Sequence, residues 1–144
     1  MPAAAAMPGH LIRRLHQIST QIFLQRVREA GYDLTPVQFA ALDALRDCPG
    51  IDQAGLANAI AKDRATIGAV VDRLEQKGLL TRAVSDQDKR ARVLALSDEG
   101  KRVIASLLPV VEGLQHEILA GLDEEEYAAF VALAAKAARE ATGE

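Results

Sequence analysis

Apolar residues recur at helical spacing over most of this chain. Near the N-terminus they lie three to four positions apart, at Leu11, Leu15, Ile18 and Ile22. This spacing places them on one face of a helix. It predicts a long first helix over about residues 10–30, which Gly31 ends.

Capping residues mark where the other helices begin. Thr35 and Gln38 form a capping box around a proline at the first helical position, and they predict a second helix that ends near Asp47. Four later helices are expected after the N-caps Asp52, Asp63, Ser97 and Asp123. Pro109 is expected to bend the helix that follows Ser97 or to break it in two.

Two of these helices follow each other closely. The first ends near Ala61, the second begins after Asp63, and Gly78 ends the second. A pair of helices joined by a turn of three or four residues is typical of a helix-turn-helix. The helix after Asp63 has one apolar face, which is expected to turn inward and consists of Ile67, Val70, Val71 and Leu74.

After Gly78 the pattern changes to two short apolar runs, Leu79–Val84 and Arg92–Leu96, with a charged stretch between them. Short aliphatic runs on either side of a polar turn predict a β-hairpin. The order of elements is therefore long helix, helix, helix-turn-helix, hairpin, long helix, helix. We predict a mainly α fold with a small β-hairpin, a winged helix-turn-helix flanked by helices at both ends.

Composition and charge add two points to this picture. Apolar residues make up 49% of the chain and aromatic residues only 3%, so the core is expected to be aliphatic. The net charge is −3, but residues 62–92 carry +3, and residues 112–144 carry −6. A basic middle in an acidic chain indicates a local anionic partner.

The charged hairpin lies where a winged helix has its wing. We expect Arg90 to insert into the DNA minor groove, with Asp88 as the carboxylate that orients it. Lys89, Arg82 and Arg92 are expected to contact phosphates. The alternative is a solvated turn whose charges serve solubility. The position directly after a helix-turn-helix favours the wing.

The second helix of the helix-turn-helix is the expected recognition helix. Arg64 stands at its start, where base edges are reached, and arginine is the commonest partner of guanine. Thr66 is expected to contact a base or a phosphate, and Arg73 a phosphate. Gly68 would let the backbone approach DNA, with Ala69 against a thymine methyl group. The alternative for this glycine is a tolerated weakness of the helix.

Residues 56–78 and 79–100 resemble the MarR family of bacterial transcription regulators. The wing sequence Asp88-Lys-Arg90, followed by Leu96-Ser97 and Gly100, is similar to that family's wing and its exit into the next helix. The order of elements agrees with the family over nearly the whole chain.

The resemblance implies a homodimer that binds double-stranded DNA at a pseudo-palindromic operator. Family members usually repress nearby genes and release DNA when a small, often aromatic, ligand binds. The chain departs from the family at Gly68 and Ala69, where larger polar or basic residues are common. The resemblance divides the chain into a disordered tail (1–8), an N-terminal dimerisation helix (9–34), a winged helix-turn-helix DNA-binding region (35–97) and C-terminal dimerisation helices (98–144).

Effectors of the family commonly bind between the dimer helices and the winged lobe. Arg14 borders the apolar stripe of the first helix, and an arginine there could pair with a carboxylate through two hydrogen bonds. His10 lies one turn earlier and would be its neighbour. An aromatic carboxylate is therefore the expected ligand class. The alternative is that these charges form ion pairs at the dimer interface or are simply solvated.

Several classes of protein find no support in the sequence. There is no phosphate loop, nucleophile elbow or metal signature, so neither an enzyme nor a cofactor is expected. Cys48 is the only cysteine, which excludes an intramolecular disulfide. No secretory signal or membrane span is evident, and we expect a cytoplasmic protein. The remaining alternative is a winged helix for protein contacts, which would carry apolar residues where this chain has charges.

Overall fold

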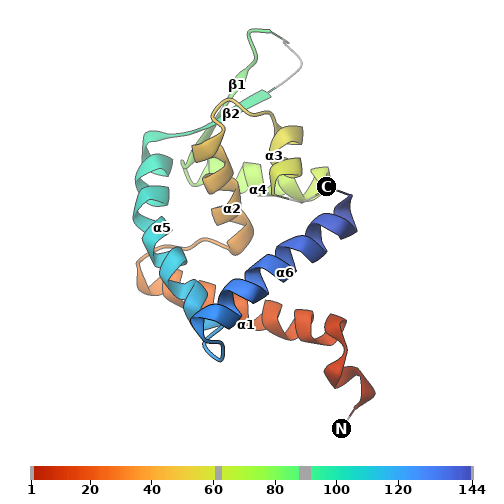
Figure 1. Cartoon of the computed structure of the whole chain (residues 1–144). Helices are drawn as coiled ribbons and strands as arrows, with labels where there is room; N and C mark the ends of the chain where they lie inside the picture. The colour runs from red at the N-terminus through yellow and green to blue at the C-terminus, as the bar shows by residue number, and fades with distance from the viewer. Residues whose placement is uncertain (1, 61–62, 88–91, 144) are drawn as a thin grey trace.

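The computed structural model describes residues 2–60, 63–87 and 92–143. It confirms a mainly α fold in which a two-stranded hairpin follows a helix-turn-helix (Figure 1). In chain order the elements are η1 (Ala3–Ala6), α1 (Pro8–Glu29), α2 (Pro36–Asp47), α3 (Gln53–Ala59), α4 (Arg64–Gln76), β1 (Leu80–Val84), β2 (Arg92–Leu96), α5 (Asp98–Ile118) and α6 (Glu124–Thr142).

The predicted helix starts are confirmed at the level of individual hydrogen bonds. At α2, Thr35 Oγ1 accepts from the Gln38 backbone N–H, and Gln38 Oε1 accepts from the Thr35 N–H, both at 3.1 Å. The other predicted N-caps likewise accept a hydrogen bond from the third helical residue: Asp52, Asp63, Ser97 and Asp123. These bonds satisfy amide groups that have no partner inside the helix.

Two local details concern the expected tail and Pro109, for which the sequence predicts a bend or a break of the helix. Within the tail expected over residues 1–8, Ala3–Ala6 form a 3-10 turn and α1 already begins at Pro8. Alanine favours helix and proline suits the first helical position, which explains both. Pro109 lies inside α5 without breaking it in two. Its neighbours Leu107 and Val111 are buried, so packing holds the helix on both sides of the missing backbone hydrogen bond.

The hairpin is held against the helices at its base. The strands are antiparallel, with Leu80 opposite Leu96 and Arg82 opposite Leu94. The backbone of Leu94 also donates to the Ile51 carbonyl at 2.8 Å, and its own carbonyl accepts from Gly50 at 2.9 Å. The turn between α2 and α3 is thereby tied to the outer edge of β2.

One aliphatic core joins the helices α1, α2, α3, α4 and α5 with the hairpin. Among the described residues no polar or charged side chain is buried in it. At its edge Arg26 of α1 donates to Glu117 of α5 through Nε and Nη2, at 2.5–3.1 Å. The hydrogen bonds from Arg26 hold the pKa of Glu117 below its ordinary value. This ion pair joins the two long helices side by side.

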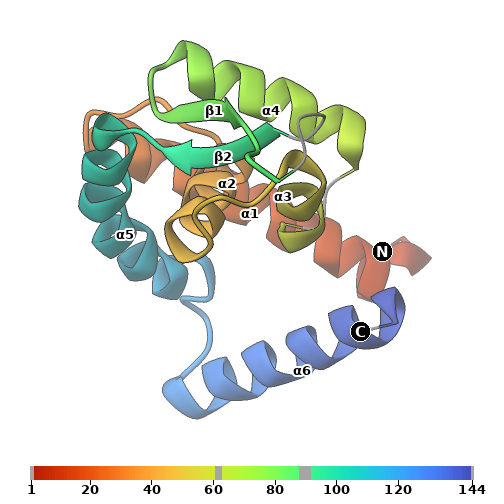
Figure 2. The ribbon, with the colours of Figure 1, turned by 90° about the horizontal axis from the view of Figure 1, so that it is seen from above.

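The last helix, α6, stands away from the rest of the chain. Figure 2 shows it apart from the winged unit, and none of its residues is buried. Its main fixed contact is at its start, where Tyr127 stacks on His116 of α5 with ring centroids 4.4 Å apart. Much of the apolar surface of α6 is consequently uncovered in the single chain.

A close backbone contact joins the end of α4, the end of β2 and the start of α5. Ser97 Oγ donates to the Gly78 carbonyl at 2.6 Å, and the Ser97 N–H donates to the Leu79 carbonyl at 3.1 Å. A Cβ atom on Gly100 would lie 1.9 Å from the Leu79 carbonyl oxygen. Only glycine fits there, because backbone on both sides leaves nothing that can move aside.

We expect Gly100→Ala to lower the free energy of unfolding by about 3 kcal/mol, because the added methyl group overpacks a backbone contact. Gly113→Ala, in the same helix, is the matched control, since a Cβ at Gly113 meets nothing within 4 Å. The control should gain up to about 1 kcal/mol from the loss of glycine flexibility. Urea unfolding followed by circular dichroism measures both, and equal stability of the two variants would contradict this account.

Candidate nucleic-acid interface

The start of α4 is fixed by its cap. Asp63 Oδ1 accepts from the Thr66 backbone N–H at 2.7 Å, and Asp63 Oδ2 accepts from the Thr66 hydroxyl at 2.9 Å. These two bonds, the backbone one first, hold the pKa of Asp63 below its ordinary value, so the carboxylate stays charged. The predicted base reader Arg64 is the first helical residue after this cap.

The cap also limits what Thr66 can do. A hydroxyl has one hydrogen, and Thr66 donates it to Asp63. The exposed oxygen can then only accept a hydrogen bond. In the major groove the amino groups of adenine and cytosine are the donors, whereas a phosphate oxygen in DNA has no hydrogen to give. Of the two contacts expected for Thr66, this geometry supports the base and not the phosphate.

The two faces of α4 differ as the sequence predicted. Of the four residues predicted to face inward, Ile67, Val71 and Leu74 are completely buried, and Val70 is partly buried against the core. Packing therefore fixes the rotation of the helix about its own axis. Ala69 and Arg73 are exposed on the other side. The apolar anchor thus determines which side chains α4 presents outward.

Gly68 lies where α4 crosses α3. A Cβ added to Gly68 would stand 3.4 Å from Nε2 of Gln53, at the limit of ordinary contact. Gly68 is also partly exposed. The end of the flexible Gln53 side chain leaves room for a Cβ atom, so packing does not require glycine here, and the approach of Gly68 to DNA stays a prediction.

The structure describes only some of the residues predicted for the wing. Asp88, Lys89 and Arg90 lie outside the described residues. Arg92 begins β2 opposite Val84 and is exposed. Arg82, in the middle of β1, is turned toward α4 and donates from Nη2 to Asp72. The sequence pattern did not connect Arg82 with Asp72, because they are ten positions apart and belong to different elements.

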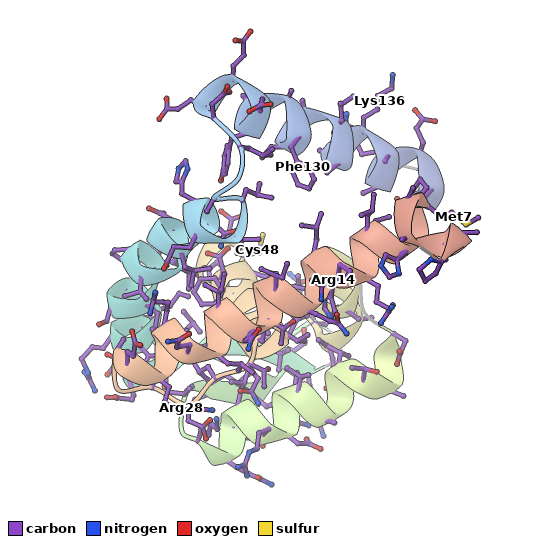
Figure 3. The ribbon with its side chains drawn as sticks, turned by 90° about the horizontal axis from the view of Figure 1, so that it is seen from below. Met7, Arg14, Arg28, Cys48, Phe130 and Lys136 are labelled. Atoms are coloured by element: carbon purple, nitrogen blue, oxygen red, sulfur yellow. The ribbon has the colours of Figure 1, made fainter. Side chains whose placement is uncertain are left out.

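The two residues expected to bind a ligand, His10 and Arg14, lie one turn apart on α1. Arg14 is exposed on α1 (Figure 3). With His16, Gln17 and Gln21 it borders a shallow, open hollow whose lining comes from α1 alone. His10 does not line this hollow, and its Nδ1 lies 3.5 Å from Nη2 of Arg13. Ligand binding by Arg14 and His10 stays a prediction.

A second hollow, of about 350 Å³, lies between α1, α5 and α6. Its lining is mostly apolar, with Leu15, Ile118 and Phe130 among the side chains, and it includes His16 and Tyr127. His16 lines both hollows, although the sequence analysis had not selected it. The signal was present, since His16 follows Ile12 by four positions and so shares its face of α1.

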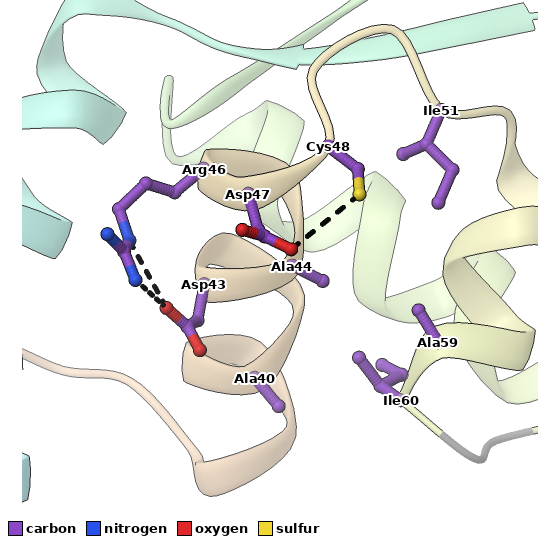
Figure 4. A pocket seen from close by; sticks show the side chains of 9 residues that line it. All are labelled: Ala40, Asp43, Ala44, Arg46, Asp47, Cys48, Ile51, Ala59 and Ile60. Atoms are coloured by element: carbon purple, nitrogen blue, oxygen red, sulfur yellow. Dashed lines mark hydrogen bonds and ion pairs between the residues drawn. The ribbon is translucent and has the colours of Figure 1, made fainter.

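A third hollow, of about 490 Å³, lies between the ends of α2 and α3 (Figure 4). Alanine and isoleucine side chains form most of it. At its rim Arg46 donates to Asp43 at 2.9 Å, and the exposed thiol of Cys48 lies 3.8 Å from Asp47 Oδ2. At this rim Arg46 and Asp43 pair with each other, and the charged group beside the thiol is the carboxylate of Asp47.

Two further properties bear on the class of protein. In the described parts of the chain, no cluster of three or more His, Cys, Asp or Glu side chains could hold a metal ion. None of the helices, in the same residues, is long and apolar enough to cross a membrane.

Comparison with known proteins agrees with this geometry. The sequence profile of the MarR family matches residues 34–91. The transcriptional regulator HosA of Escherichia coli O157:H7 is 35% identical over 127 residues, which cover 88% of this chain and 91% of HosA. The transcriptional regulator PcaV of Streptomyces coelicolor, solved with its natural ligand, has a TM-score of 0.88 and 37% identity over 98% of both chains.

The solved structure of Bordetella bronchiseptica BpsR, whose DNA binding is regulated by 6-hydroxynicotinic acid, also has a TM-score of 0.88. It is 30% identical and covers 96% of this chain and 97% of its own. The fold, the helix-turn-helix with its wing and these relatives agree: the chain belongs to the MarR family of transcriptional regulators.

Proposed function

We propose that this protein is a homodimeric, sequence-specific regulator that binds double-stranded DNA at a pseudo-palindromic operator. It acts as a repressor that a small aromatic carboxylate releases from DNA. The observation that carries the proposal is the locked rotation of α4. Three fully buried aliphatic residues hold its inner face, and its outer face lies open beside the wing.

The outer face of α4 supplies the base contacts. Arg64 reads guanine at the start of the helix, and Thr66 accepts from a base amino group. Gly68 and Ala69 line the next turn, and Arg73 binds a phosphate. At the N-terminal end of α4, the positive end of the helix dipole also favours a phosphate.

The wing reaches the DNA beside this helix. Arg90, oriented by Asp88, enters the minor groove, while Lys89 and Arg92 bind phosphates. The +3 charge of residues 62–92 supports this arrangement, because the rest of the chain is acidic.

The apolar surface that a single chain leaves uncovered supports the proposed dimer. Phe130, Val131 and Leu133 of α6 are 36–66% exposed, and Met7, Leu11 and Ile12 at the start of the chain are 48–66% exposed. In Figure 3, Phe130 points from α6 toward α1, whereas Lys136 points away. A second copy would cover this surface and set two recognition helices about 34 Å apart, one DNA turn.

The effector pairs with Arg14 through its carboxylate, and His10 assists from the same end of α1. An aromatic acid fits the regulation that is known for BpsR. The hollow beside Arg14 combines this charged residue with the apolar Ile18 and Leu24, and the neighbouring hollow between α1, α5 and α6 is also mostly apolar. Together they offer a charged group and an apolar surface, as a small aromatic acid requires.

The second candidate function is a winged helix that contacts proteins. The exposed Val84 on β1 is the observation in its favour. This function predicts no preference among DNA sequences, so the selectivity of DNA binding decides between the two.

We expect the protein to bind the duplex upstream of its own gene at least a thousandfold more tightly than a scrambled duplex. Fluorescence anisotropy at several salt concentrations measures this. Arg73→Ala should reduce the slope of log K against log salt by about 0.9 for each phosphate that the variant no longer neutralises. Arg102→Ala, on α5 and paired with Glu99, is the control and should leave the slope unchanged. Equal affinity for both duplexes, and for genomic fragments, would favour the protein-contact function.

Phe130→Glu should dissociate the dimer, because each chain places a charge in the apolar interface. Each substituted chain should lose about 2 kcal/mol of the free energy of dimerisation. Because the two chains of a symmetric dimer both carry the change, dimerisation weakens about a thousandfold. Lys136→Glu is the matched control on the same helix. Sedimentation equilibrium measures both, and a dimer unaffected by Phe130→Glu would exclude this interface.

Arg14→Ala should abolish release from DNA by aromatic acids while the affinity for DNA without ligand stays the same. The probes are benzoate and 6-hydroxynicotinic acid, added to the preformed DNA complex. Arg28→Ala, at the other end of α1 (Figure 3), should respond as the unmodified protein does. A normal response of Arg14→Ala would show that another residue holds the carboxylate.

A further inference from the structure

Arg82 of the wing makes its contacts inside the protein. Its side chain is only 26% exposed, and Nη2 donates to Asp72 Oδ1 on α4. Its Nε is buried and lies 3.7 Å from Glu75 Oε1, one turn further along the same helix. The guanidinium thus spans two carboxylates of α4.

The charge of this cluster argues against a phosphate contact. One positive and two negative charges leave a net charge of −1 at the cluster. A phosphate approaching Arg82 would meet both carboxylates, of which Asp72 is 62% and Glu75 46% exposed. Coulomb repulsion from this pair opposes what the arginine would gain.

The cluster stands where it can fix the direction of the wing. The outer edge of β2 is already tied to the turn between α2 and α3, through the two backbone hydrogen bonds of Leu94. The other strand, β1, runs next to α4 (Figure 2). Arg82 connects this strand to α4 halfway along its length. The hairpin is therefore held at both edges. A rotation of the hairpin relative to α4 would break either the Leu94 backbone hydrogen bonds or the contacts of Arg82.

We propose that Arg82 is a positioning residue that clamps the wing to the recognition helix through Asp72 and Glu75, and that it is not a phosphate contact. This proposal rests on the DNA-binding function proposed above. The clamp lets α4 and the wing meet adjacent grooves in one fixed geometry. Specific binding needs that geometry, whereas non-specific binding to phosphates does not.

Asp72→Asn gives opposite results under the two roles of Arg82. Removing a negative charge beside DNA should tighten binding if Arg82 is a phosphate contact, because the arginine is freed and repulsion falls. If Arg82 positions the wing, affinity for the operator should fall about tenfold, which is the size of effect expected for the loss of one base contact. Affinity for scrambled DNA should then stay within about twofold, and the salt slope should not change.

Asp86→Asn is the matched control, because Asp86 is an exposed carboxylate in the same hairpin. It should leave operator binding equal or slightly tighter. Arg82→Gln should resemble Asp72→Asn, and the double variant should be no worse than either single one. A slope that falls with Arg82→Gln, or operator binding that tightens with Asp72→Asn, would overturn the clamp.

Thermal unfolding of the same four proteins (unmodified, two single variants and the double variant) measures the coupling of Arg82 and Asp72 without DNA. Non-additive shifts in melting temperature are expected, and additive shifts would overturn the clamp. If the unmodified protein does not distinguish operator from scrambled DNA, the proposed function fails, and the role of the clamp in DNA binding fails with it. Selective binding by the unmodified protein, together with tighter binding by Asp72→Asn, would overturn the clamp alone.

Discussion

The close contact between Gly100 and the Leu79 carbonyl fixes how the winged unit meets the long helix α5. Ser97 completes it by bonding to the carbonyl of Gly78 and capping α5 at once. Three elements with different tasks meet there: the end of the recognition helix, the end of the wing and the start of α5. Because the contact is between backbones, it fixes the direction of α5 relative to the end of α4.

The remainder of the structure divides into a rigid and an open part. The aliphatic core joins α1 to α5 and the hairpin, and it buries no charged group among the described residues. Charges act at its edges instead, where Arg26 joins α1 to α5 and Arg82 joins β1 to α4. The last helix has no such support beyond the ring stacking of Tyr127 on His116. An exposed apolar helix of this kind is stable in water only when something covers it, which is why the dimer is part of the proposed function.

The candidate site was only partly readable from the sequence. Residue types and spacing identified α4, its inward face and its outward residues, because helical periodicity repeats every three to four positions. They did not reveal that the Thr66 hydroxyl donates its only hydrogen to Asp63, because a threonine at this position also suits a DNA contact. Nor did they reveal the partners of Arg82. Basic residues in a wing suggest phosphate as a group, and only the packing of β1 on α4 distinguishes one arginine from the next.

By itself the sequence determined the helix ends and the order of elements, because caps, glycine stops and apolar periodicity depend on neighbours within about four residues. Thr35, Asp63 and Asp123 cap the helices that the sequence assigned to them. It also determined that Ser97 would cap α5, and of the two effects expected of Pro109, a bend or a break, the break is wrong. The tertiary structure alone decided which charges are available to a ligand and which are used inside the protein. Asp72 and Arg82, or Arg26 and Glu117, are far apart along the chain, and only the folded core brings them within reach.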